Sequence, residues 1–123
     1  MTDTEKLVDA IAAHAKWRFN LKQAIETGRS EFNVETVKSD ADCEFGQWLR
    51  SLPLAERVSE NWRIVRDLHA EFHEAAAAVL DMALTGRTEE ANDELGRKGR
   101  FSQISTELTL AMSTWRKESQ GKV

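Results

Sequence analysis

Apolar residues recur every three or four positions along most of this chain, which is the spacing of one face of an α-helix. The first stripe consists of Leu7, Ile11, His14, Leu21 and Ile25. It predicts a helix from about Thr4 to Thr27 that ends at Gly28 as its C-cap. No stretch alternates cleanly enough between apolar and polar residues to form a β-sheet. The pattern therefore predicts an all-α protein.

A short helix is expected in the middle of the chain. A polar, turn-prone stretch from Gly28 to Asp42 comes first, and the short helix fits Cys43 to Ser51. Its N-cap is expected to be Asp40 or Asp42, because an aspartate side chain accepts hydrogen bonds from the first N–H groups of a helix. Pro53 ends it, since the residue before a proline avoids helical angles.

Two longer helices are expected after this proline, from about Leu54 to Leu84 and from about Thr88 to Glu118. The stripe of the first consists of Val58, Trp62, Val65, His69, Phe72, Ala76, Val79 and Ala83. The stripe of the second consists of Phe101, Ile104, Leu108, Ala111 and Trp115. Gly96 and Gly99 should weaken the last helix or allow close backbone approach. We expect one domain, residues 1–123, folded as an antiparallel four-helix-bundle-like structure whose short helix carries the cysteine.

Charge and hydropathy narrow the range of partners. The net charge of −4 argues against binding to nucleic acid or to an anionic membrane surface. The most apolar stretch, Ala75 to Leu84, is short and contains Asp81, so no segment is expected to span a bilayer. The N-terminus is polar and acidic, unlike a signal peptide. We therefore expect a cytoplasmic protein.

The candidate chemistry is concentrated in three histidines and one cysteine. His69 and His73 are four residues apart, so they share one helical face and can bind one ion together. His14 lies on the apolar stripe of the first helix, and a bundle core brings such stripes together. Cys43 begins the short helix, where a helix N-terminus favours a thiolate. Three imidazoles and one thiolate suit a tetrahedral Zn²⁺.

The same residues also have ordinary structural explanations. One histidine on an apolar stripe is more often a hydrogen-bonded core residue than a ligand, and a lone cysteine is usually a small buried hydrophobe. What favours a metal site is the joint pattern, because every histidine of the chain is either core-facing or paired.

A motif around the cysteine resembles a known family. The heptapeptide Cys43-Glu44-Phe45-Gly46-Gln47-Trp48-Leu49 is similar to the Cys-x-[Leu/Phe]-Gly-x-Trp-[Leu/Tyr] signature of the chemoreceptor zinc-binding (CZB) domain family. That family places a histidine upstream, close before a tryptophan, as His14 and Trp17 stand here. It places a His-x-x-x-His pair downstream, as His69 and His73 stand here.

The resemblance extends from about Leu7 to Trp115 and implies both a site and a function. The implied ligands of one zinc ion are His14, Cys43, His69 and His73. Such domains resemble accessory sensors that are attached to cytoplasmic chemoreceptors or diguanylate cyclases. They are linked to the sensing of zinc, and to the sensing of oxidants such as hypochlorous acid through the metal-bound cysteine. This chain shows no output domain, which leaves two alternatives, a stand-alone sensor or an excised fragment. The resemblance implies a chemoreceptor or diguanylate cyclase as the signalling partner.

The resemblance also implies a homodimer, for which the sequence gives one hint. Several apolar residues offer more apolar surface than a small bundle needs, although an ordinary core would use them equally well. They are Trp62, Leu110, Met112 and Trp115.

Two other classes of protein remain as alternatives. The first is a metal-dependent enzyme using Glu71, but this residue lies about 200° round the helix from His69. In a metalloprotease the glutamate directly follows the first histidine, which is not the case here. A deaminase needs a Pro-Cys-x-x-Cys motif, which this sequence lacks. A di-iron oxygen carrier needs more histidines and bridging carboxylates than these stripes offer. Four protein ligands also leave no open position for water. The second is a metal-free helical interaction module. We expect that the protein is not an enzyme.

Overall fold

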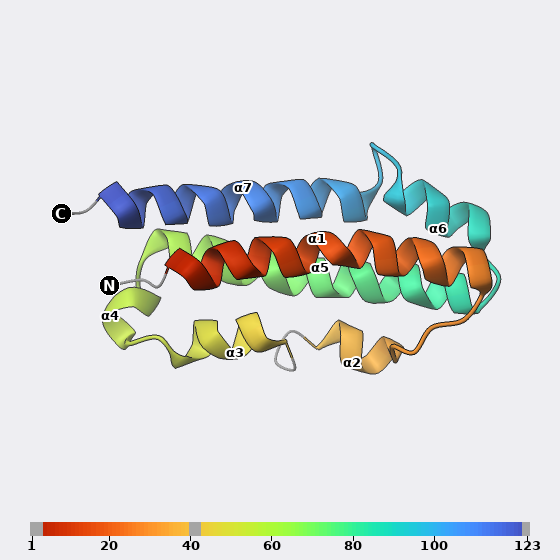
Figure 1. Cartoon of the computed structure of the whole chain (residues 1–123), viewed down its shortest axis with the longest axis horizontal. Coiled ribbons are helices and arrows are strands. Elements are labelled where there is room, and N and C mark those ends of the chain that lie inside the picture. The colour runs from red at the N-terminus through yellow and green to blue at the C-terminus, as the bar shows by residue number, and fades with distance from the viewer. Residues whose placement is uncertain (1–3, 40–42, 122–123) are drawn as a thin grey trace.

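The computed structural model describes residues 4–39 and 43–121, and all regular structure within these ranges is α-helical (Figure 1). The helices are α1 (Thr4–Thr27), α2 (Val34–Lys38), α3 (Glu44–Ser51), α4 (Leu54–Arg57), α5 (Glu60–Leu84), α6 (Thr88–Leu95) and α7 (Arg100–Gly121). The expected all-α fold class is confirmed.

The chain passes along the bundle four times, in alternating directions. Figure 1 shows α1 and α5 running in one direction, while α2 with α3, and α6 with α7, return in the other. Helix α5 is central, since it packs against α1, α2, α3 and α7. The architecture is therefore an antiparallel four-helix bundle in which the second and fourth passes are each broken into two helices.

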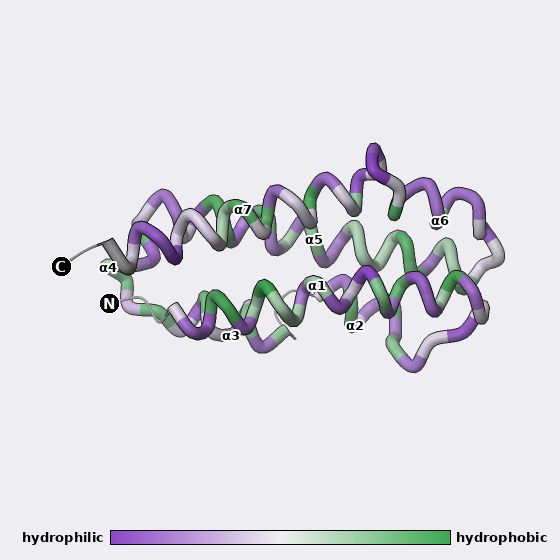
Figure 2. The backbone as a smooth tube through the Cα atoms, turned by 45° about the horizontal axis from the view of Figure 1, so that its top comes forward, coloured by the Kyte–Doolittle hydropathy of each residue, from purple (hydrophilic) through white to green (hydrophobic). Residues whose placement is uncertain are grey.

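The predicted stripes form the core. Leu7 and Leu21 of α1, Phe72 of α5, and Phe101 and Leu108 of α7 are almost fully buried. Along every long helix, hydrophobic residues recur between hydrophilic ones with each turn, as Figure 2 shows. Each helix therefore turns one face inward, and burial of these apolar side chains provides the main stabilisation, at roughly 25 cal/mol per Å² removed from water.

The first helix ends where the sequence predicts. Gly28 has a φ of +70°, and its N–H donates to the carbonyl of Ala24 at 2.8 Å. A residue without Cβ adopts this left-handed conformation at little cost, so Gly28 allows the chain to leave α1.

The single helix expected from Leu54 to Leu84 is wrong, because the chain forms α4 and α5 instead. Ser59 is the N-cap of α5, and its hydroxyl accepts a hydrogen bond from the backbone N–H of Trp62 at 3.1 Å. Val58 precedes this cap and is 66% exposed, so it does not belong to the core stripe. The local serine cap overrides the apparent continuity of the apolar pattern.

The last predicted helix is also divided in two. Helix α6 ends at Leu95 and α7 begins at Arg100. A Cβ added to Gly99 would lie 2.1 Å from the carbonyl oxygen of Glu94. Gly99 therefore permits the close backbone approach that the sequence suggested, and that approach separates the two helices.

The predicted start of the short helix needs correction. The N-cap of α3 is Cys43 itself, and the helix begins one residue later, at Glu44. The predicted caps, Asp40 and Asp42, lie outside the described residues. The backbone of Cys43 is extended (φ −83°, ψ 134°), which turns the chain into the helix directly at the cysteine.

The apolar residues that hinted at a dimer are mostly core. Trp62, Met112 and Trp115 are buried, and only Leu110 is exposed. Three of these four residues are therefore explained by the fold of one chain.

No helix within the described residues is long and apolar enough to cross a membrane.

Candidate metal centre

The three histidines and the cysteine meet inside the bundle. His14 comes from α1, His69 and His73 come from α5, and Cys43 comes from the start of α3. One donor atom from each residue lies within 4.8 Å of all the others. All three histidines are at least 95% buried, and Cys43 is partly exposed. Residues up to 59 positions apart therefore converge as the sequence pattern predicts.

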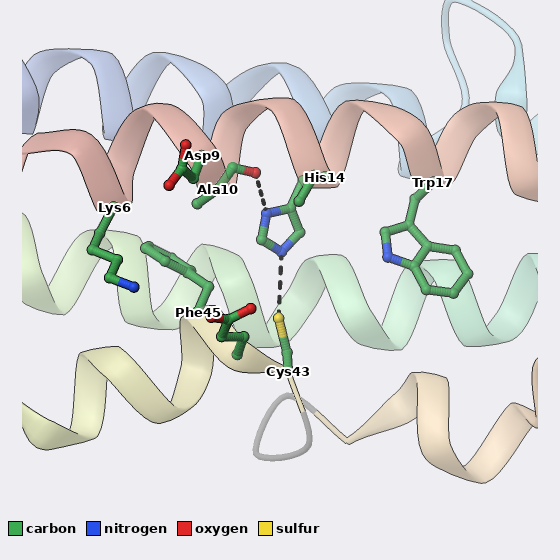
Figure 3. A pocket seen from close by; sticks show the side chains of 9 residues that line it. Lys6, Asp9, Ala10, His14, Trp17, Cys43 and Phe45 are labelled. Atoms are coloured by element: carbon green, nitrogen blue, oxygen red, sulfur yellow. Dashed lines mark hydrogen bonds between the residues drawn. The ribbon is translucent and has the colours of Figure 1, made fainter.

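A backbone carbonyl fixes the orientation of the His14 ring. Its Nδ1 lies 2.7 Å from the carbonyl oxygen of Ala10, one helical turn earlier. A carbonyl only accepts hydrogen bonds, so Nδ1 carries the proton and donates it. The Nε2 atom then presents its lone pair toward Cys43, whose Sγ lies 3.9 Å away (Figure 3). Such a carbonyl partner is the usual device that orients a ligating histidine.

His73 is oriented in the same way from another element. Its Nδ1 donates to the carbonyl oxygen of Val37 at 2.8 Å. Its Nε2 lies 3.1 Å from Nε2 of His69, so the two imidazoles converge on one point. Val37 belongs to α2, a helix that the sequence did not predict. The contact is made by a backbone carbonyl, which has no side-chain signature, although Asn33 before Val34 is a recognisable N-cap.

Aromatic rings pack against the histidines of the cluster. The ring of Phe45 contacts those of His14 and His69 edge to face, with centroids 5.8 and 5.1 Å apart. Phe72 contacts His14 at 5.0 Å from the other side. These rings help to bury the imidazoles, and burial strengthens electrostatic interactions within the site.

The helix that carries the cysteine is anchored to the bundle by two further contacts. Trp48 lies against Trp115 of α7, with ring centroids 5.8 Å apart. The indole N–H of Trp62 on α5 donates to the carbonyl of Leu49 at 2.9 Å. Gly46 lies on the buried side of α3, together with Phe45 and Leu49. The motif residues thus hold α3 in place so that Cys43 reaches the histidines.

Burial keeps two of the imidazoles neutral. Desolvation lowers the pKa of His14 from 6.5 to about 4, although its bond to Ala10 opposes this shift. Desolvation, with repulsion from His73 and His14, lowers the pKa of His69 to about 2. Both rings are therefore unprotonated near pH 7, which is the form that binds a metal.

The donor set fits zinc in chemistry and in spacing. In a tetrahedral site with Zn–N near 2.05 Å and Zn–S near 2.3 Å, neighbouring nitrogens lie about 3.3 Å apart, and nitrogen and sulfur about 3.6 Å apart. The His69–His73 and His14–Cys43 separations of 3.1 and 3.9 Å are close to these values. Glu71 is exposed on α5 and is not a member of the cluster.

Two cavities are each lined by Cys43 and by a histidine of the cluster. One of about 150 Å³ opens between Lys6, Asp9 and Trp17 of α1 and reaches His14 and Cys43 (Figure 3). The other, of about 370 Å³, lies beneath α2 and reaches Cys43 and His73. The sulfur atom is therefore the member of the cluster that both cavities reach.

Comparison with known proteins agrees with this geometry. The family model for the chemoreceptor zinc-binding domain matches residues 14–80, a range that contains all four donor residues. The match is shorter than the Leu7 to Trp115 resemblance, because it ends before α6 and α7. No curated protein and no solved structure matches the chain. The matched range covers more than half of the sequence, and zinc is the cofactor that both the family and the donor set indicate. This chain belongs to the chemoreceptor zinc-binding domain family.

Proposed function

We propose that one Zn²⁺ is bound by Nε2 of each histidine and by Sγ of the cysteine. The ligands are His14, Cys43, His69 and His73. The observation that carries this proposal is the convergence of four donor atoms within 4.8 Å, two of them already oriented by backbone carbonyls. Bound zinc supplies a positive charge that stabilises the thiolate and joins α1, α3 and α5.

We propose further that the domain is a sensor or regulatory module and not an enzyme. Four protein ligands satisfy a tetrahedral zinc and leave no position for a catalytic water. Family membership supports a signalling role. The expected partners are a second copy of the chain and a chemoreceptor or diguanylate cyclase, all in the cytoplasm.

The signal is proposed to enter through Cys43, either as zinc itself or as an oxidant such as hypochlorous acid. The thiolate attacks hypochlorous acid, giving a sulfenic acid on the protein and a chloride ion, so that sulfur loses two electrons and chlorine gains them. Both cavities reach this sulfur, which supports its accessibility. The chain has one cysteine, so an external thiol must reduce the product.

Oxidation removes the only anionic donor and leaves three neutral imidazoles. Helix α3 then loses its link to the metal. It is still held to α5 by the contact of Phe45 with His69 and by the hydrogen bond from Trp62 to the carbonyl of Leu49, so its attachment is weaker. The long helices keep their apolar core. We therefore expect the response to be a displacement of α3 within an intact bundle.

The test treats zinc-loaded protein with one equivalent of hypochlorous acid, followed by mass spectrometry and a zinc-release dye. We expect an oxidised Cys43 and released zinc. Cys43→Ser is the matched control, because it removes the thiol and keeps the side-chain size. Oxidation of methionine with Cys43 and zinc untouched would contradict redox sensing and leave a structural or zinc-sensing role.

A further inference from the structure

A second apolar stripe runs along α1 on the side facing solvent. It consists of Val8, Ala12, Ala15 and Phe19, which we call the outer stripe. All four residues are exposed, and Val8 and Phe19 are 44% and 63% exposed. Their spacing of four, three and four residues places them on one line along the helix. Isolated exposed apolar residues are ordinary, but a continuous line of them marks an interaction surface.

Neither the core nor the metal cluster requires this stripe. The core face of α1 is formed by Leu7, His14 and Leu21, and at 100° per residue the outer stripe lies about 100° or more from it. In Figure 1, α1 runs in front of α5 with α7 alongside it. Arg18 donates to the hydroxyl of Ser102 on α7 at 3.0 Å, which fixes the side of α1 that α7 covers. The outer stripe remains outside these contacts.

We propose that the outer stripe binds the outer stripe of a second copy of this chain, with the two α1 helices antiparallel. The stripe has large residues at its ends and alanines at its centre, so it has the same spacing in both directions. Antiparallel pairing places Val8 opposite Phe19 of the second copy, and Ala12 opposite its Ala15. The alanines allow the helices to approach closely, and the large side chains fill the space at both ends.

The charges beside the stripe favour the same arrangement. Asp9 and Lys16 are both exposed and lie along one edge of the outer stripe. In an antiparallel pair related by a two-fold axis, Asp9 of each copy faces Lys16 of the other. In a parallel pair related by a two-fold axis, the charged edges of the two copies would lie on opposite sides of the contact, so Asp9 would not meet Lys16. The surface is therefore self-complementary in both shape and charge, which identifies a second copy of the chain as its partner.

This inference names the surface of the homodimer proposed above and does not depend on the metal. We would measure the dissociation constant of the zinc-loaded chain by sedimentation, at concentrations up to about 100 µM. Phe19→Glu should raise the dissociation constant about tenfold or more, because a charge would replace the large apolar side chain that packs against Val8 of the second copy. Leu54→Glu is the matched control, since Leu54 is 68% exposed on α4 and lies outside the stripe, and it should have no effect.

A charge exchange tests the antiparallel register. Asp9→Lys and Lys16→Asp should each weaken the dimer about threefold or more, and the double variant should restore it. Zinc content and helical circular dichroism are measured on every variant. A wild-type chain that stays monomeric, or a Phe19→Glu variant that dimerises normally, would overturn the proposal. Failure of the double variant to restore dimerisation would overturn the antiparallel pairing. Zinc content reports separately on the metal site.

Discussion

Acid should destabilise the metal-free protein through its buried histidines. His14 and His69 have pKa values of about 4 and about 2 in the folded chain, against 6.5 for an unburied imidazole. Because the folded pKa values lie below the unfolded one, the unfolded chain binds more protons than the folded chain at pH values between them. The free energy of unfolding therefore falls as pH drops below 6.5.

The size of the effect follows from these pKa values. At pH 5, an imidazole with a pKa of 6.5 gains about 2 kcal/mol from protonation in the unfolded chain. The folded forms of His14 and His69 gain almost nothing at that pH. The two residues together should lower the free energy of unfolding by about 4 kcal/mol between pH 7.5 and pH 5. That is a large fraction of the roughly 5–15 kcal/mol of a typical domain.

Urea unfolding of chelator-treated protein, followed by circular dichroism at the two pH values, measures this loss. His14→Gln should reduce the loss to about 2 kcal/mol, because one of the two titrating groups is gone while a polar side chain of similar size remains. A wild-type loss below about 1 kcal/mol would refute the reasoning. A His14→Gln variant that loses as much as the wild type would show that other groups cause the acid sensitivity.

Two other predictions concern α3. Zinc removal should increase hydrogen exchange at residues 43–49 more than in the long helices. The reason is that α3 depends on the Cys43 ligand, while α1, α5 and α7 keep their apolar stripes. Equal protection of residues 43–49 with and without zinc would contradict this prediction. Trp62→Phe removes the hydrogen bond to the carbonyl of Leu49 and should lower stability by about 1 kcal/mol in denaturant unfolding. The phenyl ring is smaller than the indole, so lost packing adds to this loss, and an unchanged midpoint would show that the bond contributes nothing.

The sequence predicted the long passes of the bundle well because apolar spacing determines which face is buried. Helix α1 has the predicted bounds, Thr4–Thr27, and the pairing of His69 with His73 follows from their separation of four residues. What periodicity missed were the interruptions. A cap at Ser59 and a close approach at Gly99 end helices locally, within a pattern that otherwise continues.

The convergence of the four side chains was predictable from the sequence, and their backbone partners were less so. The carbonyl of Ala10 is one turn before His14 and follows from helix geometry. The carbonyl of Val37 does not, because α2 has only five residues, too few for a periodic signal, and its contact with His73 is long-range. A backbone acceptor leaves no residue type to recognise, so only the fold reveals it.

Elemental analysis of the reconstituted chain tests the zinc site most directly. Wild-type protein, dialysed after loading with excess zinc, should retain about one zinc per chain. His69→Ala and His73→Ala should lose it or bind it far more weakly, while circular dichroism shows that the long helices remain. Glu71→Ala is the matched control on the exposed face of α5 and should retain the metal. A folded wild-type protein that retains no zinc would contradict the account.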